Sequence, residues 1–314
     1  MNMSLIMLNY RNNRFISRLK LAIWPKIIAP QHRDSLRDRC GLVTVTDRLR
    51  EECESLGMPQ IHPWIFMRVK NEGKTLLKSL QTILDISDRG VIGYNDCSDN
   101  SEDLIMSWCR TNPGYIPFKY DKKIIPAHSP KYANLHNLKE ENTLAGYYNA
   151  VLSFIPKDEW ILKVDGDHIH YPSILKHAMT LPRDQNEWVS FSRLNLVRVG
   201  REFRVISYVR PGDHYMIFNR GLNFVNVAGY RKNGTFFAHE SLRKNGKGLG
   251  SLPPPWKPEC SNIHLPYEKD YRACPFNTDK LRSVPIFFNN CDSSEFSSEF
   301  RNLVLKDLSD LLLS

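Results

Sequence analysis

Residues 160–170 read W-I-L-K-V-D-G-D-H-I-H. The apolar run from Trp160 to Val164 predicts a buried strand that stops at two aspartates, Asp165 and Asp167. Carboxylates that follow a strand of an open α/β sheet lie at its carboxyl edge, where ligands bind. Two carboxylates so close repel each other, which favours a Mg²⁺ or Mn²⁺ ion with a diphosphate as co-ligand. The alternative is a turn in which aspartate serves only the local backbone.

The residues before this stretch alternate between strand and helix patterns. Strands are predicted over 64–69, 90–94, 116–120 and 160–164, with helical stripes over 76–84, 101–109 and 144–155. Such alternation implies a parallel sheet with right-handed crossovers. Asn95 and Asp96 close the second strand, so they would lie on the same sheet edge as Asp165 and Asp167. Acidic residues at the ends of separate strands favour a nucleotide site over a chance turn.

Beyond residue 181 the pattern changes to alternating β runs. Residues 188–199 and 203–209 predict a hairpin, a further run covers 215–218, and 303–313 predict a terminal helix. A polar loop is expected over 126–142. The basic residues 243–247 predict a second loop, which either closes over a bound diphosphate or is simply solvated.

The composition is that of a globular protein with an anionic partner. Of the 314 residues, 41% are hydrophobic and 25% charged, and the net charge is +9. The seven cysteines form no C-x-x-C pair, which argues against a disulfide framework or zinc ribbon and favours a reducing cytoplasm. The sequence contains no run of about 18 apolar residues, so no membrane-spanning helix is expected.

The first 33 residues carry basic side chains and no acid. Ile16, Leu19, Ile23 and Ile27 recur at helical spacing among them. This pattern predicts a basic amphipathic helix that lies on an anionic membrane surface. The alternative is a helix whose apolar stripe packs on the body of the protein.

Longer motifs around the strand ends resemble one family. They are P-W-I-F-M-R-V-K-N-E (63–72), R-G-V-I-G-Y-N-D-C-S-D-N-S-E (89–102), F-I-P-K-D-E-W-I-L-K-V-D-G-D-H (154–168) and G-D-H (212–214). Together they resemble the bacterial β-1,4-N-acetylgalactosaminyltransferases that build ganglioside-like outer cores of lipooligosaccharide. The similarity is strong over residues 63–181, thinner towards residue 220 and weak at both ends of the chain.

This resemblance implies a GT-A fold, with a mostly parallel, Rossmann-like α/β sheet flanked by helices and a mixed acceptor-side half. It implies an inverting transfer of N-acetylgalactosamine from UDP-GalNAc to a galactose hydroxyl in β-1,4 linkage, with Mn²⁺ or Mg²⁺ as cofactor. The acceptor would be a lipid-linked, galactose-terminated oligosaccharide at the cytoplasmic face of a bacterial inner membrane. The residues themselves leave the donor open among UDP-GalNAc, UDP-GlcNAc, UDP-galactose and UDP-glucose, the last three for capsule or O-antigen synthesis.

The resemblance also assigns roles by position. Asp165 would bind ribose and metal, and Asp167 would be the first metal ligand. The family commonly has valine between them, where this chain has Gly166, and a glycine there is expected only to loosen the backbone. Segment 127–137 departs from the family's pattern and would reshape the acceptor side. The predicted nucleotide contacts are Arg68, Asn71, Glu72 and Asp96, the last on the uracil ring.

An inverting transfer needs a general base beyond the D-x-D motif. The candidates are Glu240, which follows an aromatic pair, and Asp213 in G-D-H. GT-A enzymes often add a late histidine to the metal, and His264 is the predicted third ligand. Nearby His168, His170 and His214 are expected to serve hydrogen bonding within the fold.

The chain is therefore expected to comprise a basic segment (1–60), a nucleotide-sugar-binding half (61–181), an acceptor and catalytic-base half (182–300) and a C-terminal helix (301–314). A D-x-D-x-T phosphatase is disfavoured because Ile169 stands where Thr or Val is needed. A calcium loop is disfavoured because no Asp/Asn-Gly pattern follows Asp167. The remaining alternative is a non-catalytic nucleotide-sugar-binding module. Nucleic acid is not an expected partner, because the aromatic residues are not interleaved with basic ones.

Overall fold

The structure is a computed structural model. It describes residues 61–313 apart from 128, 183, 231–235, 253–254, 257, 270–271 and 292–295. The predictions for residues 1–60, including the basic amphipathic helix, lie outside the described residues.

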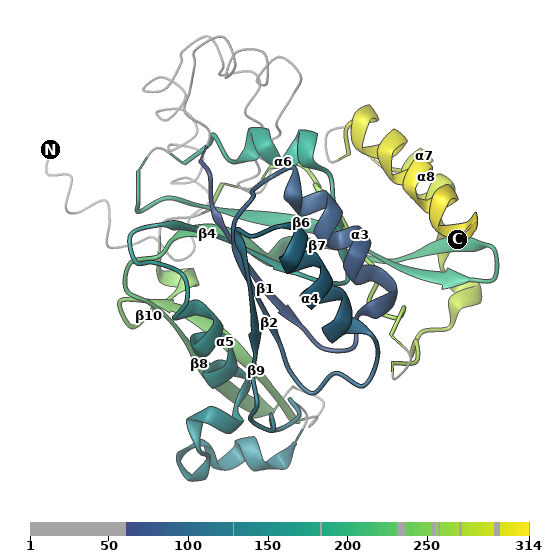
Figure 1. Ribbon diagram of the computed structural model, residues 1–314. Coiled ribbons are helices and arrows are strands. Elements are labelled where there is room, and N and C mark those ends of the chain that lie inside the picture. The colour runs from purple at the N-terminus through teal and green to yellow at the C-terminus, as the bar shows by residue number, and fades with distance from the viewer. Residues whose placement is uncertain are drawn as a thin grey trace, which may run out of the picture.

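The first half of the main sheet forms from the strand–helix alternation that the sequence predicts. Its strands run parallel in the order β3-β2-β1-β4, as Figure 1 shows for β1, β2 and β4, so their carboxyl ends share one edge. In chain order the elements are β1 (Trp64–Val69), α3 (Gly73–Leu84), β2 (Gly90–Tyr94), α4 (Ser101–Thr111), β3 (Tyr115–Lys119), α5 (Leu144–Leu152) and β4 (Trp160–Asp165).

Helices cover both faces of this parallel half. Met67 of β1 belongs to the same apolar core as Leu76 of α3. Phe66 faces the other way, and its ring centroid lies 5.8 Å from that of Tyr148 in α5. Because side chains alternate along a strand, Arg68 points to the same side as Phe66. The α5 side of the sheet therefore carries the first predicted site residue.

The second half of the main sheet is mixed. Strand β7 pairs antiparallel with both β4 and β6, and the described sheet has nine strands in the order β3-β2-β1-β4-β7-β6-β11-β5, with β12 on β7. None of the described helices is long and apolar enough to cross a membrane. The elements are β5 (His168–His170), α6 (Pro172–Ala178), β6 (Trp188–Val199), β7 (Glu202–Phe218), β11 (Asn262–His264), β12 (Arg282–Ser283), α7 (Val284–Asn289) and α8 (Ser298–Leu313).

Strand β7 corrects one sequence prediction. The runs 203–209 and 215–218 were expected to be separate, with G-D-H between them, but both belong to one strand. The pairing with β6 shifts between Phe191 and Arg193, which lets the ladder continue past the glycine. His214 is thereby held at a fixed position in the sheet.

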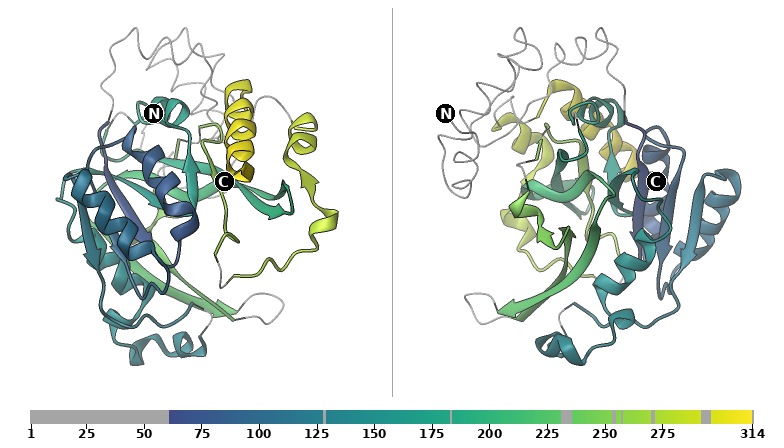
Figure 2. Two further views of the ribbon diagram at one scale, coloured as in Figure 1. Left: turned by 45° about the vertical axis from the view of Figure 1, so that its right-hand side comes forward. Right: turned by 90° about the vertical axis from the view of Figure 1, so that its left-hand side faces the viewer.

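A three-stranded sheet lies beside α5 and extends away from the main sheet (Figure 2). The expected basic loop at 243–247 is wrong, because Arg243 and Lys244 end β9 and Lys247 starts β10. Asn245 and Gly246 form the turn with φ of 51° and 74°, as Asn-Gly turns of hairpins require. The strands are β8 (Leu222–Tyr230), β9 (Phe236–Lys244) and β10 (Lys247–Gly248).

The expected polar loop 126–142 contains two short 3₁₀ helices, η2 (Pro130–Asn137) and η3 (Glu140–Asn142). Tyr132 of η2 is buried, and its hydroxyl accepts a hydrogen bond from Leu144 N and donates one to Ile125 O. This tyrosine joins the segment to the first turn of α5. Further 3₁₀ turns are η4 (Leu249–Ser251) and η5 (Thr278–Lys280).

Candidate active site

The candidate site begins at the carboxyl ends of β1 and β2. Asn71 and Asp96 have φ of 52° and 49°, a left-handed conformation that turns the chain away from each strand. The Asn71 amide bonds to Ser98 N at 2.7 Å and Ser98 Oγ at 2.9 Å, which ties the two loops together. Asp96 is exposed, and its hydrogen bond to Lys70 lowers its pKa. Asp96 is therefore accessible at the ligand edge, whereas the Asn71 amide is already engaged.

Asp165 ends β4 and faces the antiparallel neighbour β7. The pairing sets Lys163 opposite Tyr215, and the adjacent His214 places Nε2 3.2 Å from Asp165 Oδ2. Burial alone would raise the pKa of Asp165, but Lys163 and His214 hold it well below its usual range. Oδ1 of Asp165 is buried and has no hydrogen-bond partner among the described residues. This oxygen is available to a ligand.

Asp167 is buried between a histidine and a lysine. Its Oδ2 lies 3.3 Å from His264 Nε2 and 2.8 Å from Lys269 Nζ. Burial would raise the pKa of Asp167, but His264 and Lys269 lower it. Lys269 Nζ also lies 2.6 Å from Glu72 Oε1. For Glu72 burial prevails and, together with the nearby Asp167, raises its pKa to about 8.

Gly166 makes room for this buried glutamate. A β-carbon at position 166 would lie 2.2 Å from Glu72 Oε2 and 3.0 Å from Leu76 Cδ1. Atoms essentially never approach a β-carbon so closely, so any larger residue at position 166 would force the Glu72 side chain to move. The expectation that glycine only loosens the backbone is therefore wrong. Glu72, predicted as a nucleotide contact, forms the floor of the site beneath the D-x-D turn.

Imidazole rings surround the two aspartates. The ring centroid of His168 lies 3.9 Å from that of His214 and 4.2 Å from that of His264. Burial lowers the pKa of His214 to about 4, which favours the neutral ring that metals bind. Two groups of side chains could each hold a metal ion, with ligand atoms within 4.8 Å of one another: Asp165, His168 and His214; and Asp167, His168 and His264.

These groups fit a divalent cation. Carboxylate oxygens and imidazole nitrogens are the donors that first-row divalent metals prefer. The unpartnered Asp165 Oδ1 adds a further oxygen at the same place. The structure thus brings Asp165, Asp167 and the predicted third ligand His264 together, and it adds His168 and His214.

Arg68 connects these carboxylates to one candidate base. Parallel pairing sets Arg68 beside Asp165, and its guanidinium lies 4.5 Å from the Tyr148 ring centroid. Burial would lower the pKa of Arg68, but its neighbours, including Tyr148, Asp165 and Glu240, raise it. Glu240 lies on the same face of β9 as buried Ala238 and Leu242, and Leu242 packs in one cluster with residues of α5, so Glu240 points from the second sheet toward α5. It also acts on the Tyr148 hydroxyl, and burial first and then Glu240 raise the pKa of that group.

Asp213 is the other candidate base, and an ion pair with Arg193 connects it to the site. Its exposed carboxylate pairs with Arg193, which in turn acts on both Asp165 and Asp167. The Asp213 carboxylate is therefore neutralised by Arg193 at the rim of the site.

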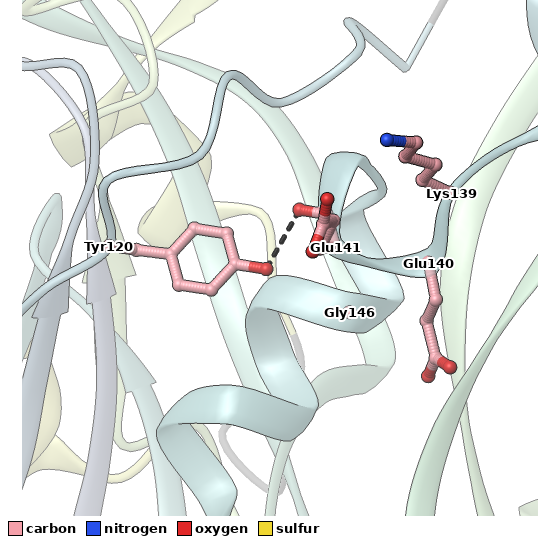
Figure 3. A pocket seen from close by; sticks show the side chains of 5 residues that line it. All are labelled: Tyr120, Lys139, Glu140, Glu141 and Gly146. Carbon is pink, nitrogen blue, oxygen red and sulfur yellow. Dashed lines mark hydrogen bonds between the residues drawn. The ribbon is translucent and has the colours of Figure 1, made fainter.

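Two pockets lie along the same edge. One of about 250 Å³ adjoins the Glu72–Lys269 pair, between the loops that follow β1 and β2. The other, of about 470 Å³, lies where β3 ends and α5 begins, and Figure 3 shows the Tyr120 hydroxyl bonded to the Glu141 carbonyl there. No residue of either metal group lines this second pocket. The first is lined by Asn71, Gly73, Lys74, Ser98, Asp99, Glu268 and Lys269.

A sequence model of one family, the β-1,4-N-acetylgalactosaminyltransferases (CgtA), matches residues 51–302. The match covers most of the chain and includes the D-x-D turn, both candidate bases and His264. The chain belongs to this family. The predicted GT-A fold class is confirmed. No curated protein matches the chain.

Several solved structures are similar to this family member over part of its length. Glucosyl-3-phosphoglycerate synthase from Mycobacterium tuberculosis, in complex with Mn²⁺, UDP and phosphoglyceric acid, has 14% identity, 48% coverage of each chain and a TM-score of 0.29. The inositol-1-phosphate CTP transferase from T. maritima has 12% identity over 51% of this chain and 72% of that one, with a TM-score of 0.32. HddC from Yersinia pseudotuberculosis has 10% identity over 66% and 95%, with a TM-score of 0.29. The chain spans about half the length of the first.

The sequence analysis did not identify the cationic side chains that surround the two aspartates. Lys163 lies inside the apolar run before Asp165 and is only 4% exposed. Because a lysine is rarely buried without a charged partner, its place in this run could have indicated a role at the site. Arg193 and Lys269 carried no such signal, because only the pairing of β6, β7 and β11 brings their segments to the aspartates. Tyr148 was expected only as part of the apolar stripe of α5.

Proposed function

We propose that the chain is an inverting transferase that moves N-acetylgalactosamine from UDP-GalNAc to the 4-hydroxyl of a galactose in a lipooligosaccharide or similar glycan. One observation carries the proposal: buried Arg68 is paired with Asp165 of the D-x-D turn across β1 and β4, stacks on Tyr148 at 4.5 Å, and lies near enough to Glu240 of the second sheet for that charge to raise its pKa. The D-x-D aspartates and a candidate base therefore lie on either side of Arg68, in a chain of the N-acetylgalactosaminyltransferase family.

The charges around the two aspartates suit a nucleotide diphosphate. Cationic Arg68, Lys163, Arg193 and Lys269 surround the aspartates. When bound by these aspartates, a divalent cation neutralises the charge that develops on the leaving diphosphate. The side chains around the aspartates would hold the donor in line with the acceptor hydroxyl. Asp96, exposed at the end of β2, would accept a hydrogen bond from the uracil ring.

Glu240 is our proposed general base. The acceptor hydroxyl gives its proton to the Glu240 carboxylate while its oxygen bonds to the sugar C1. The bond from C1 to the diphosphate oxygen breaks on the opposite face, UDP leaves with that electron pair, and the configuration inverts. Asp213 is the weaker candidate, because its ion pair with Arg193 stabilises the deprotonated form and makes it a poorer proton acceptor.

The acceptor is proposed to be lipid-linked and galactose-terminated, reached from the cytoplasmic face of an inner membrane. The net charge of +9 supports attraction to an anionic surface. Segment 130–137, held to α5 by Tyr132, lies on the same side of the sheet as Glu240 and would border the acceptor.

UDP release tests this function. The full chain is incubated with UDP-GalNAc, UDP-GlcNAc, UDP-galactose or UDP-glucose and a galactose-terminated acceptor, with Mn²⁺ and then with EDTA. We expect release chiefly from UDP-GalNAc, dependent on acceptor and abolished by EDTA. Preference for another sugar would make the chain a related hexosyltransferase. Tight UDP binding with no turnover on any acceptor would indicate a binding module instead.

A further inference from the structure

The pairing of β11 aligns two histidines and one asparagine across the main sheet. Strand β11 lies between β5 and β6, with His264 opposite His168 on one side and beside Asn195 on the other. The rings of His168 and His264 stack at 18°, and both present Nε2 toward Asp167. This arrangement follows from strand register, so it does not depend on a flexible loop.

An amide oxygen fixes the tautomer of His168. Its Nδ1 lies 2.8 Å from Asn262 Oδ1. The Nδ2 of Asn262 donates to the carbonyl of Ser192 at 2.9 Å, which identifies the other amide atom as the oxygen. Because that oxygen only accepts, His168 must carry its proton on Nδ1. In the neutral ring the Nε2 lone pair therefore faces Asp167 Oδ1, 3.8 Å away.

His264 is held in the same way by a different asparagine. Its Nδ1 lies 2.8 Å from Asn195 Oδ1. Arg193 Nε donates to that same oxygen at 3.1 Å, and an arginine nitrogen can only donate. The neutral His264 ring therefore also presents its Nε2 lone pair, 3.3 Å from Asp167 Oδ2. Two lone pairs and a carboxylate whose ligand atoms lie within 4.8 Å of one another favour a cation between them.

We infer that Asp167, His168 and His264 form one three-ligand cation site, that Asn262 and Asn195 hold its imidazoles in the metal-binding tautomer, and that the site takes an imidazole-preferring divalent cation without needing the nucleotide. The inference deepens the proposed function, on which it rests for the role of the cation in transfer. Amides that bind the second nitrogen of a histidine ligand are known to orient the ring and raise its basicity. Protein ligands in this number and of this kind favour Zn²⁺, Co²⁺ or Mn²⁺ over the oxygen-seeking Mg²⁺.

A cation at Asp167 would take the place of one existing contact. Lys269 Nζ lies 2.8 Å from Asp167 Oδ2, where it supplies positive charge. The same ammonium is 2.6 Å from Glu72 Oε1, so it keeps a partner when a cation takes the Asp167 oxygen. The Lys269 ammonium thus supplies, in the absence of a metal, the positive charge that balances Asp167.

The test measures cation binding by the full-length chain in the absence of nucleotide. The EDTA-treated, desalted protein is titrated with Co²⁺, followed by its visible absorption, and then with Zn²⁺, Mn²⁺ and Mg²⁺ in competition. We expect a visible band typical of imidazole ligation and displacement by Zn²⁺ and Mn²⁺ at concentrations at least ~10-fold lower than by Mg²⁺. Binding that appears only with UDP, or that Mg²⁺ satisfies equally, overturns the inference.

Variants assign the ligands and the positioning residues. His264→Gln is expected to abolish the band, whereas His214→Gln leaves it. The opposite result would move the cation to Asp165, His168 and His214. Asn195→Leu should weaken Co²⁺ binding by ~10- to 100-fold, and Asn195→Asp, which keeps an accepting oxygen, should restore it. Equal affinity of both Asn195 variants, with circular dichroism showing both folded, contradicts the positioning role.

These outcomes are distinct from failure of the proposed function. Sugar transfer supported by Mg²⁺ with no nucleotide-free binding would remove the inference and leave the transferase assignment intact. Nucleotide-free Co²⁺ binding without UDP release from any sugar would support the cation site and remove the transfer assignment.

Discussion

Replacing Gly166 by alanine tests whether packing beneath the D-x-D turn is as tight as the structure indicates. The new β-carbon would lie 2.2 Å from Glu72 Oε2, so the carboxylate must move by roughly 1 Å to reach an ordinary contact. It cannot move freely, because it is buried and bonded to Lys269. Losing that charge-assisted bond costs about 1.5–3 kcal/mol, and overpacking costs about 1–3 kcal/mol. Because the two costs overlap, we expect a loss of about 2–3 kcal/mol in the free energy of unfolding.

Urea unfolding followed by far-UV circular dichroism measures this loss, with EDTA present to exclude bound cations. Adding Glu72→Ala should relieve the clash, so the double variant should be more stable than the sum of the single effects by about 2 kcal/mol. Glu72→Gln keeps the bulk and should give no relief. Gly250→Ala is the matched control, because a β-carbon there would meet nothing within 4 Å. Wild-type stability of Gly166→Ala, or strict additivity with Glu72→Ala, would refute the reasoning.

Substitutions at Glu240, Asp167 and Tyr132 test the base, the cation site and the support of α5. Glu240→Gln should lower turnover by ~10²-fold or more with UDP affinity unchanged, and Asp213→Asn should lower it less; the reverse order in steady-state kinetics would transfer the base role. Asp167→Asn should abolish cation-dependent UDP release, and restored release at high Mn²⁺ would argue against direct ligation. Tyr132→Phe removes the hydroxyl bonds to Leu144 N and Ile125 O, so the free energy of unfolding should fall by about 1–2 kcal/mol with little change in kcat.

The parallel half of the fold was predictable because each of its elements is a local pattern. Strand β4 is an apolar run that ends in aspartates, and α3 is a helical stripe that starts after a polar turn. Local patterns of this kind also located Asp165, Asp167 and Asp96 on one edge. The prediction was wrong at 243–247, because the basic residues were given more weight than the Asn-Gly turn between two strands. It was also wrong for β7, where a register shift lets one strand continue past a glycine.

The rest of the site depends on pairing between distant segments. His264 meets Asp167 only because β11 inserts between β5 and β6, and Glu240 meets Arg68 only because the second sheet packs on α5. Neither register can be inferred from spacing along the chain. Gly166 shows a further reason, since its role depends on the bulk of Glu72, a residue far from it in sequence.

NMR analysis of the purified product identifies the transferred sugar, its linkage and its anomeric configuration. The chain is incubated with UDP-GalNAc, Mn²⁺ and a galactose-terminated acceptor, and the new glycosidic bond is assigned from its anomeric coupling and its through-bond correlation. We expect N-acetylgalactosamine linked through a β-configured C1 to O4 of the galactose, with UDP as the other product. An α-configured linkage would contradict inversion with Glu240 as base, and the absence of any product despite UDP binding would contradict the transferase itself.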